Sequence, residues 1–341
     1  MHTILITGGA GFIGSHLADM LLARGDRVLA LDDLSTGSTA NVAHLRDQPR
    51  FTLVHGDVAD AAVLEPLVAQ CDAVVHLAAA VGVELVLRAP VAMIGTNVGG
   101  TDAVLRAAQR HGRRVLLAST SEVYGKSAQI PFREDGDLTL GPPAITRWSY
   151  ACSKLLDEFL ALAYHREHGL SVTIARFFNT VGPRQTGRYG MVVPRFVRAA
   201  LHNEPLIITG DGAQTRCFCH VFDTAAAVVA LLDTPAAVGQ VVNIGNPEEI
   251  SIRALAERVV AQTGSRSDFV FQPYASFYGP GFADLPRRVP DITRLITLTG
   301  LQPQRTLDTI LHDVIAYERH EPFTPAPALG AGDGGAGRGG Q

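Results

Sequence analysis

The sequence lacks any long apolar run, since its uncharged stretches are short and interrupted by glycine, histidine or aspartate. A helix that spans a bilayer needs about 20 apolar residues, so we expect no segment of this chain to cross a membrane. The first residues, Met1–Thr7, contain no basic region and too short an apolar stretch for a secretory signal. A soluble, cytoplasmic protein is therefore expected.

Cysteine and excess charge are also scarce. The four cysteines, Cys71, Cys152, Cys217 and Cys219, do not show the spacing of a disulfide framework, and a cytoplasmic chain is expected to keep them reduced. The formal net charge is only −4, and both signs are interspersed along the chain. There is thus no basic face to bind nucleic acid, and any anionic ligand must be held by a few arginines and backbone amides.

One short segment concentrates soft metal ligands, because Cys217, Cys219 and His220 fall within four residues. Along a β-strand, however, the two cysteines would point to one face and the histidine to the other. We therefore expect a buried strand after Arg216 and no metal site.

The composition is otherwise that of a folded globular protein, with 47% hydrophobic and 18% charged residues over 341 positions. A chain of this length forms one large domain or two closely packed ones. Over the first 180 residues or so, β-type apolar stretches alternate with amphipathic helical ones, which is typical of an α/β fold with a doubly wound parallel sheet, the Rossmann type. The predicted strands are 2–7, 27–32, 51–55, 73–77, 114–118 and 171–176, and the main predicted helices are 14–24, 91–111 and 150–168.

The chain divides into three parts. Residues 1–177 carry the alternating pattern and are predicted to form the Rossmann domain. Loop signals such as Gly182-Pro183-Arg184 follow, and the shorter elements of residues 178–322 predict a smaller α/β substrate lobe whose chain interleaves with the first domain. Residues 323–341 are mainly glycine, proline and alanine and are expected to form a disordered tail.

A glycine-rich turn joins the first predicted strand to the first predicted helix. It places Gly8, Gly11 and Gly14 in a G-x-x-G-x-x-G spacing. Glycine lets the backbone turn tightly and approach a pyrophosphate group, which the positive end of the helix attracts. Asp32 ends the second predicted strand, where it can accept a hydrogen bond from a ribose 2′-hydroxyl and repel a 2′-phosphate. The turn and Asp32 together predict NAD, rather than NADP, as the cofactor, with Asp33 able to share the role of Asp32.

Two later segments fit the same cofactor pocket. Asp57 follows the third predicted strand, where an acid can meet the adenine amino group. The fourth predicted strand ends in the small residues 78–80, which allow the backbone to approach the cofactor closely. Either segment alone is also explained by ordinary packing.

Tyr150 and Lys154 lie four residues apart on one face of the predicted helix 150–168. A cation beside the phenol, together with the positive nicotinamide, favours the phenolate and lowers the pKa of the tyrosine. Tyr150 can then remove a proton from a sugar hydroxyl while a hydride leaves for NAD, and Lys154 is expected to hold the nicotinamide ribose. The expected cofactor contacts are Gly8, Gly11, Phe12, Ile13, Gly14, Asp32, Asp57, Val58, Leu77, Ala78, Ala79, Tyr150 and Lys154.

These motifs together resemble the extended short-chain dehydrogenase/reductase family of nucleotide-sugar epimerases, dehydratases and decarboxylases. The resemblance covers residues 1 to about 320. It implies that Thr120 hydrogen-bonds the sugar 4-hydroxyl and assists Tyr150, and that Asn179 and Arg216 contact the substrate diphosphate. It also implies that NAD is tightly held and regenerated, so that the net reaction is redox-neutral.

Glu122 narrows the choice of reaction. Simple 4-epimerases generally carry a small or neutral residue at this position. The segment Ser-Thr-Ser-Glu-Val-Tyr-Gly at residues 119–125 resembles UDP-glucuronate decarboxylases and also GDP-mannose 4,6-dehydratases. Both reactions oxidise C4 and then act at C5, so the resemblance implies that Glu122 is a second acid or base. The competing interpretation is an acid at a helix start or in a solvated loop.

Arg288 has two possible roles. Residues 147–150 and the segments 276–282 and 286–292 resemble the decarboxylase domain of the enzyme of 4-amino-arabinose lipid modification, in which the arginine at this position is assigned to the acid chemistry. An arginine fork suits a C6 carboxylate, to which it can donate two hydrogen bonds. The corresponding arginine of epimerases clamps the diphosphate instead, and both roles stay open.

The loop at residues 80–85 departs from the pattern, because decarboxylases of the UDP-xylose type usually carry a proline-rich, tyrosine-containing loop there. Its substrate contacts are therefore in doubt. Arg188 lies in a loop that can reach the sugar, and it would also suit a uronic acid 4-epimerase, which holds the same carboxylate without losing it. The expected catalytic residues are Thr120, Glu122, Tyr150, Lys154 and Arg288, and the expected substrate contacts are Ser121, Asn179, Arg188, Val193, Arg216, Tyr278 and Arg288.

The leading hypothesis is a UDP-glucuronate decarboxylase that makes UDP-xylose or its 4-keto precursor. The alternatives are a 4-epimerase of UDP-glucuronate or another UDP-sugar, an NDP-hexose 4,6-dehydratase, and a protein that senses NAD or a nucleotide without turnover. The presence of both Tyr150 and Lys154 argues against the last. Helices 91–111 and 150–168 are expected, by analogy with relatives, to form a four-helix bundle in a homodimer, with no nucleic-acid or membrane partner.

Overall fold

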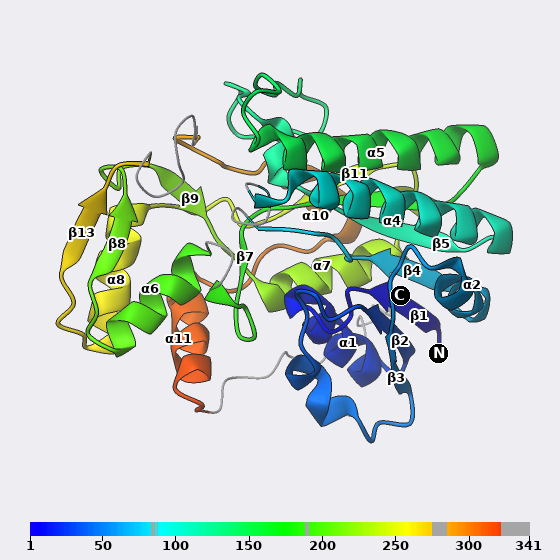
Figure 1. The fold of residues 1–341 in the computed structure, drawn as a ribbon, viewed down its shortest axis with the longest axis horizontal. Coiled ribbons are helices and arrows are strands. Elements are labelled where there is room, and N and C mark those ends of the chain that lie inside the picture. Colours follow the sequence, from blue (N-terminus) through cyan, green and yellow to red (C-terminus); the bar gives the residue numbers. More distant parts are fainter. Residues whose placement is uncertain (83–85, 87, 188–190, 275–284, 322–341) are drawn as a thin grey trace, which may run out of the picture.

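A seven-stranded parallel sheet forms the centre of the computed structural model, which describes residues 1–82, 86, 88–187, 191–274 and 285–321 (Figure 1). The strand order is β11-β6-β5-β4-β1-β2-β3. These strands are β1 (Thr3–Thr7), β2 (Arg27–Asp32), β3 (Phe51–His55), β4 (Ala73–His76), β5 (Arg114–Thr120), β6 (Val172–Phe177) and β11 (Val241–Ile244). The predicted doubly wound parallel sheet is confirmed, although β5 runs on past the predicted end at Ala118.

Helices cover both faces of this sheet. One face carries α1 (Phe12–Arg24), α7 (Val221–Asp233), α10 (Thr293–Thr299) and the 3-10 helix η1 (Thr39–Leu45). The other face carries α2 (Ala61–Gln70), α4 (Pro90–His111) and α5 (Trp148–His168). Two short 3-10 helices, η2 (Ser121–Tyr124) and η4 (Pro235–Ala237), follow β5 and α7.

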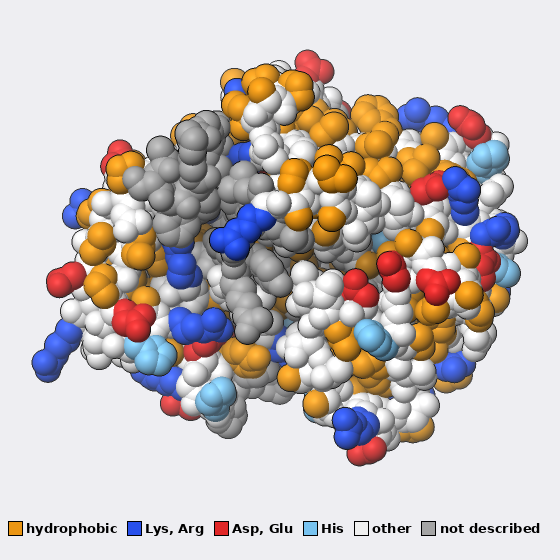
Figure 2. All heavy atoms as spheres, in the orientation of Figure 1, with side chains coloured by type: hydrophobic (Ala, Val, Ile, Leu, Met, Phe, Trp, Pro, Cys, Tyr) orange, Lys and Arg blue, Asp and Glu red, His pale blue; other side chains and the backbone are white. Residues whose placement is uncertain are grey.

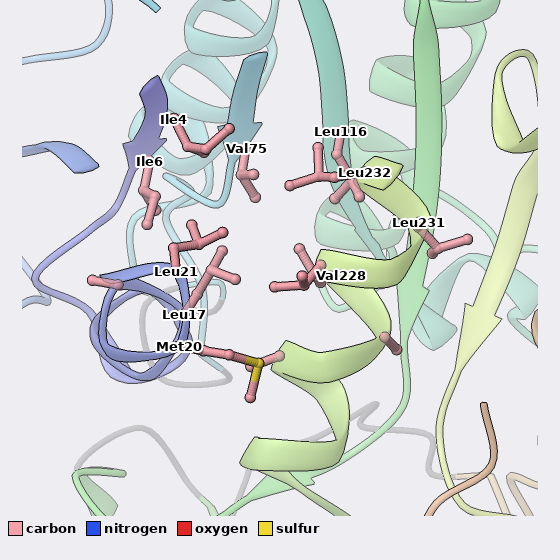
Figure 3. Packing of buried hydrophobic residues seen from close by; sticks show 14 of the residues in the cluster. Ile4, Ile6, Leu17, Met20, Leu21, Val75, Leu116, Val228, Leu231 and Leu232 are labelled. Atoms are coloured by element: carbon pink, nitrogen blue, oxygen red, sulfur yellow. The ribbon is translucent and has the colours of Figure 1, made fainter. Parts of the chain in front are cut away.

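Because side chains alternate along each strand, neighbouring residues belong to two separate cores, one on each face of the sheet. In β1, Ile4 and Ile6 belong to the core beneath α1 and α7, whereas Leu5 belongs to the core beneath α2, α4 and α5. Figure 3 shows Leu17 and Leu21 of α1 beside Ile6, in the same core as the labelled residues of α7. Burial on both faces explains why the strands read as continuous apolar stretches in the sequence.

A third core belongs to the smaller lobe. It lies among α6 (Val192–Leu201), α8 (Ile252–Thr263), α11 (Leu307–Glu318) and the parallel pair β8 (Leu206–Thr209) and β13 (Phe269–Gln272). Two more pairs complete the described strands, namely β7 (Thr180–Val181) with β10 (Cys219–His220) and β9 (Thr215–Cys217) with β12 (Glu249–Ser251).

The chain after Phe177 returns to the central sheet. Helix α7 packs against α1, and β11 pairs with β6 as an edge strand. The boundaries 1–177 and 178–322 stay predictions, and the tail 323–341 lies outside the described residues. Among the helices that the structure describes, none has the length and apolarity needed to cross a membrane.

The topology gathers the sequence motifs at one edge. Because the sheet strands are parallel, the glycine turn after β1, Asp32 at the end of β2 and Thr120 at the end of β5 all lie at the carboxyl edge. Ligands of open α/β sheets bind outside this edge.

Candidate active site

The glycine turn is packed too tightly for side chains. A Cβ atom on Gly14 would come within 2.2 Å of the Gly8 oxygen, and one on Gly8 would come within 2.9 Å of the Ala78 nitrogen. Gly8 also has a φ of +73°, in the region that favours glycine. Helix α1 begins at Phe12, and no side chain caps its N-terminus. A bare helix start beneath a close backbone turn fits the pyrophosphate of a dinucleotide.

Asp32 holds this turn in place through hydrogen bonds to backbone amides. Its two carboxylate oxygens accept hydrogen bonds from the backbone amides of Ala10, at 2.9 Å, and Leu34, at 2.8 Å. Burial raises the pKa of Asp32, and these amides oppose the rise. Asp33 is exposed and binds Ser35. The structure thus shows that Asp32 stabilises the backbone next to the glycine turn. Its contact with a ribose stays a prediction.

The other expected cofactor positions surround the same edge. Asp57 accepts a hydrogen bond from the amide of Ala59, and Val58 is buried in the core. The amide of Leu77 donates to the Thr7 carbonyl oxygen, which holds the end of β4 against the glycine turn. Phe12, Ile13 and Ala79 are among the partly exposed positions there.

Tyr150 and Lys154 lie in the first turns of α5, with the lysine buried. Burial raises the pKa of the Tyr150 phenol, the Glu122 charge raises it further, a hydrogen bond with Thr120 lowers it and the Asp157 charge raises it. For the protein alone the pKa of Tyr150 is thus raised, and Lys154 forms an ion pair with Asp157 at 2.9 Å; the expected lowering, which includes the charge of the nicotinamide, stays a prediction.

Lys154 begins a buried polar chain that reaches back to the glycine turn. Thr101 lowers the pKa of the Asp157 carboxyl, and the Thr101 hydroxyl lies 3.2 Å from the His76 Nε2 atom. The Nδ1 atom of His76 lies 2.7 Å from the hydroxyl of Thr7. Sequence reasoning missed Asp157 and Thr101, although the three-residue spacing of Lys154 and Asp157 on a helix was a visible signal.

Glu122 lies in η2, directly after β5, between two arginines. Arg147 Nη2 is 3.3 Å from Glu122 Oε2, and Arg288 Nη1 donates to Glu122 Oε1. Burial raises the pKa of Glu122, but the Arg288 and Arg147 guanidiniums together hold it below its ordinary value. The Thr120 hydroxyl accepts a hydrogen bond from the Glu122 amide at 3.2 Å. The structure therefore joins Thr120, Tyr150, Glu122 and Arg288 in one site and adds Arg147, which the sequence analysis did not single out.

The residues expected to contact the substrate differ in their surroundings. Asn179 donates to the Cys217 carbonyl oxygen, and Arg216 is mostly buried with its Nη1 atom on the Thr215 carbonyl oxygen. Ser121 is buried, and Val193 is part of the core of the smaller lobe. Two further candidates, Arg188 and Tyr278, lie outside the described residues.

The Cys217–His220 segment forms two short strands rather than one, because β9 pairs with β12 and β10 pairs with β7. Burial raises the pKa of Cys217 and of Cys219 to about 12, so both are thiols at neutral pH. His220 pairs with Asp313 at 3.2 Å. In the parts of the chain that the structure describes, no three His, Cys, Asp or Glu side chains are grouped to hold a metal ion.

Comparison with known proteins gives a consistent picture. The sequence model of the "NAD dependent epimerase/dehydratase family" matches residues 4–245. A Bacillus cytotoxicus protein named UDP-N-acetyl-alpha-D-glucosaminuronate decarboxylase is 41% identical over 92% of this chain and 97% of its own length. UDP-glucuronic acid decarboxylase 1 of Arabidopsis thaliana is 40% identical over 89% of this chain and 67% of its own length.

Solved structures agree on the fold. The dTDP-glucose 4,6-dehydratase DesIV of Streptomyces venezuelae, solved with NAD bound, has a TM-score of 0.84 at 32% identity and covers 93% of this chain and 97% of its own. A UDP-glucose 4-epimerase of Thermotoga maritima, solved with UDP-glucose, has a TM-score of 0.84 at 28% identity and covers 93% of this chain and 99% of its own.

Proposed function

The chain belongs to the NAD dependent epimerase/dehydratase family, and within that family we propose that it is a decarboxylase of a UDP-hexuronate, with UDP-glucuronate as the leading substrate. The observation that carries the proposal is Glu122 held between Arg147 and Arg288, next to Tyr150. A 4-epimerase needs only the base at C4, whereas this site places a second acid or base and two carboxylate-binding groups beside it. Relatives named as uronate decarboxylases over most of the chain support the same conclusion.

The glycine turn and the bare start of α1 would hold the pyrophosphate of NAD, Asp32 would meet its adenosine ribose, and Lys154 would meet its nicotinamide ribose. NAD, when bound, supplies the acceptor for the C4 hydride and returns that hydride later, which makes the reaction redox-neutral.

Tyr150 removes the proton of the sugar 4-hydroxyl, and Thr120 shares the hydrogen bond that fixes this hydroxyl. Oxidation at C4 turns a uronate into a β-keto acid. Its C5–C6 bond then breaks, CO2 leaves, and the bonding electrons form an enolate over C5, C4 and the C4 oxygen. An acid must protonate C5, and Glu122 is the group placed to do so. Overall, one proton is consumed for each CO2 released.

The test is incubation of the purified protein with NAD and UDP-glucuronate, following CO2 and the sugar product by NMR. We expect CO2 together with UDP-xylose or its 4-keto precursor. UDP-galacturonate without CO2 would establish the 4-epimerase, and a 4-keto-6-deoxy product from a neutral NDP-hexose would establish the dehydratase. Bound NAD with no product from any of these sugars would support the non-catalytic alternative. The Tyr150→Phe variant is the control, because it removes the base and leaves the pocket intact.

A second uronate belongs in the same assay. The Bacillus cytotoxicus relative is named for the 2-acetamido form of the uronate. The C4–C6 chemistry is identical for both, so the groups around Glu122 suit either. Comparison of kcat/KM for UDP-glucuronate and for its 2-acetamido analogue decides between them.

We also infer a homodimer in the cytoplasm. Helices α4 and α5 pack side by side and expose Val91, at 85%, Leu156, at 50%, and Phe159, at 63%. Apolar side chains also appear in Figure 2 over the region where α4 and α5 lie. A second copy of the same helix pair would cover these side chains in a four-helix bundle.

A further inference from the structure

The carboxylate of Glu122 occupies a position suited to a different carboxylate. It lies between Arg147, which approaches from the start of α5, and Arg288, which approaches from the segment before α10. Both guanidiniums are largely buried. A guanidinium pair binds any planar carboxylate by the same charge-assisted hydrogen bonds.

A bound uronate brings such a carboxylate to the same place. Its C4 hydroxyl would lie at Tyr150 and Thr120, and C6 is only two bonds from C4. Glu122 follows Thr120 by two residues, and its amide donates to the Thr120 hydroxyl. The sugar carboxylate and the Glu122 carboxylate therefore compete for Arg147 and Arg288.

We propose that the carboxylate of a bound uronate displaces Glu122 from between Arg147 and Arg288, and that the displaced Glu122 takes up a proton from solvent and later delivers it to C5. The inference rests on the proposed function, because it requires a uronate in this site. Arg147 then becomes a substrate-binding residue. Binding of the substrate also protonates Glu122, the acid needed for the last half of the reaction.

The proton uptake follows from the surroundings of Glu122. In the described part of the chain, the titratable and charged groups against it include Arg288, Arg147 and the Tyr150 phenol. Burial raises the pKa of Glu122 most strongly, and the two guanidiniums lower it. When a uronate takes over the guanidiniums and adds its own negative charge, burial and repulsion both favour the protonated acid.

The steps balance. One solvent proton binds to Glu122 as the uronate binds, CO2 leaves with breakage of the C5–C6 bond, and the Glu122 proton forms the new C5–H bond. The ionised Glu122 can then return to Arg147 and Arg288, because the pentose product has no carboxylate to compete with it. Product release is thereby favoured over substrate release.

Calorimetry of the NAD-loaded Tyr150→Phe variant tests the exchange without turnover. Titration at pH 7 with UDP-glucuronate, in two buffers of different ionisation enthalpy, reports the protons bound per site. We expect about one proton for UDP-glucuronate and close to none for UDP-glucose, which has the same nucleotide and ring but a neutral C6. The further change Glu122→Gln should abolish the uptake, and UDP-glucuronate should bind at least as tightly, because the competing carboxylate charge is gone.

A second experiment tests the role of Arg147 by measuring binding affinity. Arg147→Gln should weaken UDP-glucuronate binding about tenfold or more and leave UDP-glucose binding unchanged, with Arg147→Lys partly restoring it. Arg253→Gln, at an exposed ion pair with Glu257, is the matched control and should change neither ligand. Equal proton uptake with both sugars, uptake that persists in Glu122→Gln, or uronate binding without uptake would overturn the exchange. Uptake of one proton by the Tyr150→Phe variant, together with a wild-type protein that releases no CO2 from UDP-glucuronate, would uphold the exchange and overturn the decarboxylation.

Discussion

The ammonium of Lys154 lies 2.9 Å from Oδ2 of Asp157, and both side chains are buried in α5. The lysine that is expected to assist Tyr150 is therefore bound to an internal anion. Asp157 also raises the pKa of Tyr150 by its charge. We expect Asp157 to be a positioning residue that acts on the reaction through Lys154 and Tyr150.

Asp157→Asn should move the acid limb of the kcat/KM profile to lower pH. Loss of the Asp157 charge lowers the pKa of Tyr150, so the phenolate persists in more acidic solution. The same change leaves a buried ammonium unpaired and should lower the free energy of unfolding by roughly 3 kcal/mol. Asp102→Asn, at the exposed pair with Arg106, is the control and should move neither quantity. An acid limb that stays in place would show that Asp157 is only structural.

Acid should destabilise the fold below pH 6.5 through two buried histidines. The pKa values of His16 and His76 are lowered by burial from 6.5 to about 3. Between these values the unfolded chain binds protons that the folded chain does not. The stability is thus fully present above pH 6.5 and is lost as the pH falls toward 3, by about 1.4 kcal/mol per pH unit for each histidine.

Urea unfolding at pH 7.5, 6 and 5 measures this loss. His76→Gln keeps hydrogen-bonding groups near Thr7 and Thr101 but cannot be protonated. Its stability should therefore depend less steeply on pH than that of the wild type. The exposed His2→Gln serves as the control. Parallel pH curves for wild type and His76→Gln would contradict the assignment.

Asp32→Asn should weaken NAD binding about tenfold or more, because the asparagine side chain has only one acceptor oxygen and its NH2 group cannot replace the other for the backbone hydrogen bonds from Ala10 and Leu34. It should also reduce the preference for NAD over NADP, since the charge that repels a 2′-phosphate is gone. Titration with both dinucleotides measures this. Asp33→Asn should have little effect, because Asp33 is exposed and its carboxylate accepts hydrogen bonds from Ser35 outside the glycine turn. A larger effect at Asp33 would transfer the role to that residue.

If the proposed homodimer forms through α4 and α5, Phe159→Glu should separate it into monomers, because it places a charge among the exposed apolar side chains of these helices. Sedimentation velocity of the wild type and the variant measures the association state. Phe271→Glu is the control, since Phe271 is 47% exposed on β13 in the smaller lobe. A wild type that sediments as a monomer, or a dimer that survives Phe159→Glu, would exclude this interface.

The sequence by itself determined six of the seven strands of the central sheet, the glycine turn and the spacing of Tyr150 and Lys154, but not the edge strand β11. These features are local, because they depend on neighbouring residues in the chain. Such features are the side-chain periodicity of a strand or helix and the backbone freedom of glycine. The position of Asp32 followed from the same pattern, since a strand ends where its apolar stretch ends.

Only the tertiary structure decided what surrounds those residues. Arg288 meets Glu122 across 166 positions of sequence, from a segment with no periodicity to predict its place. Arg147 reaches the same carboxylate from the start of α5. The spacing of Lys154 and Asp157 was visible, but a helix face can be solvated or buried, and burial is what makes Asp157 a strong partner for the lysine. Charge acts through space and through the local dielectric, and both are set by the packing of distant segments.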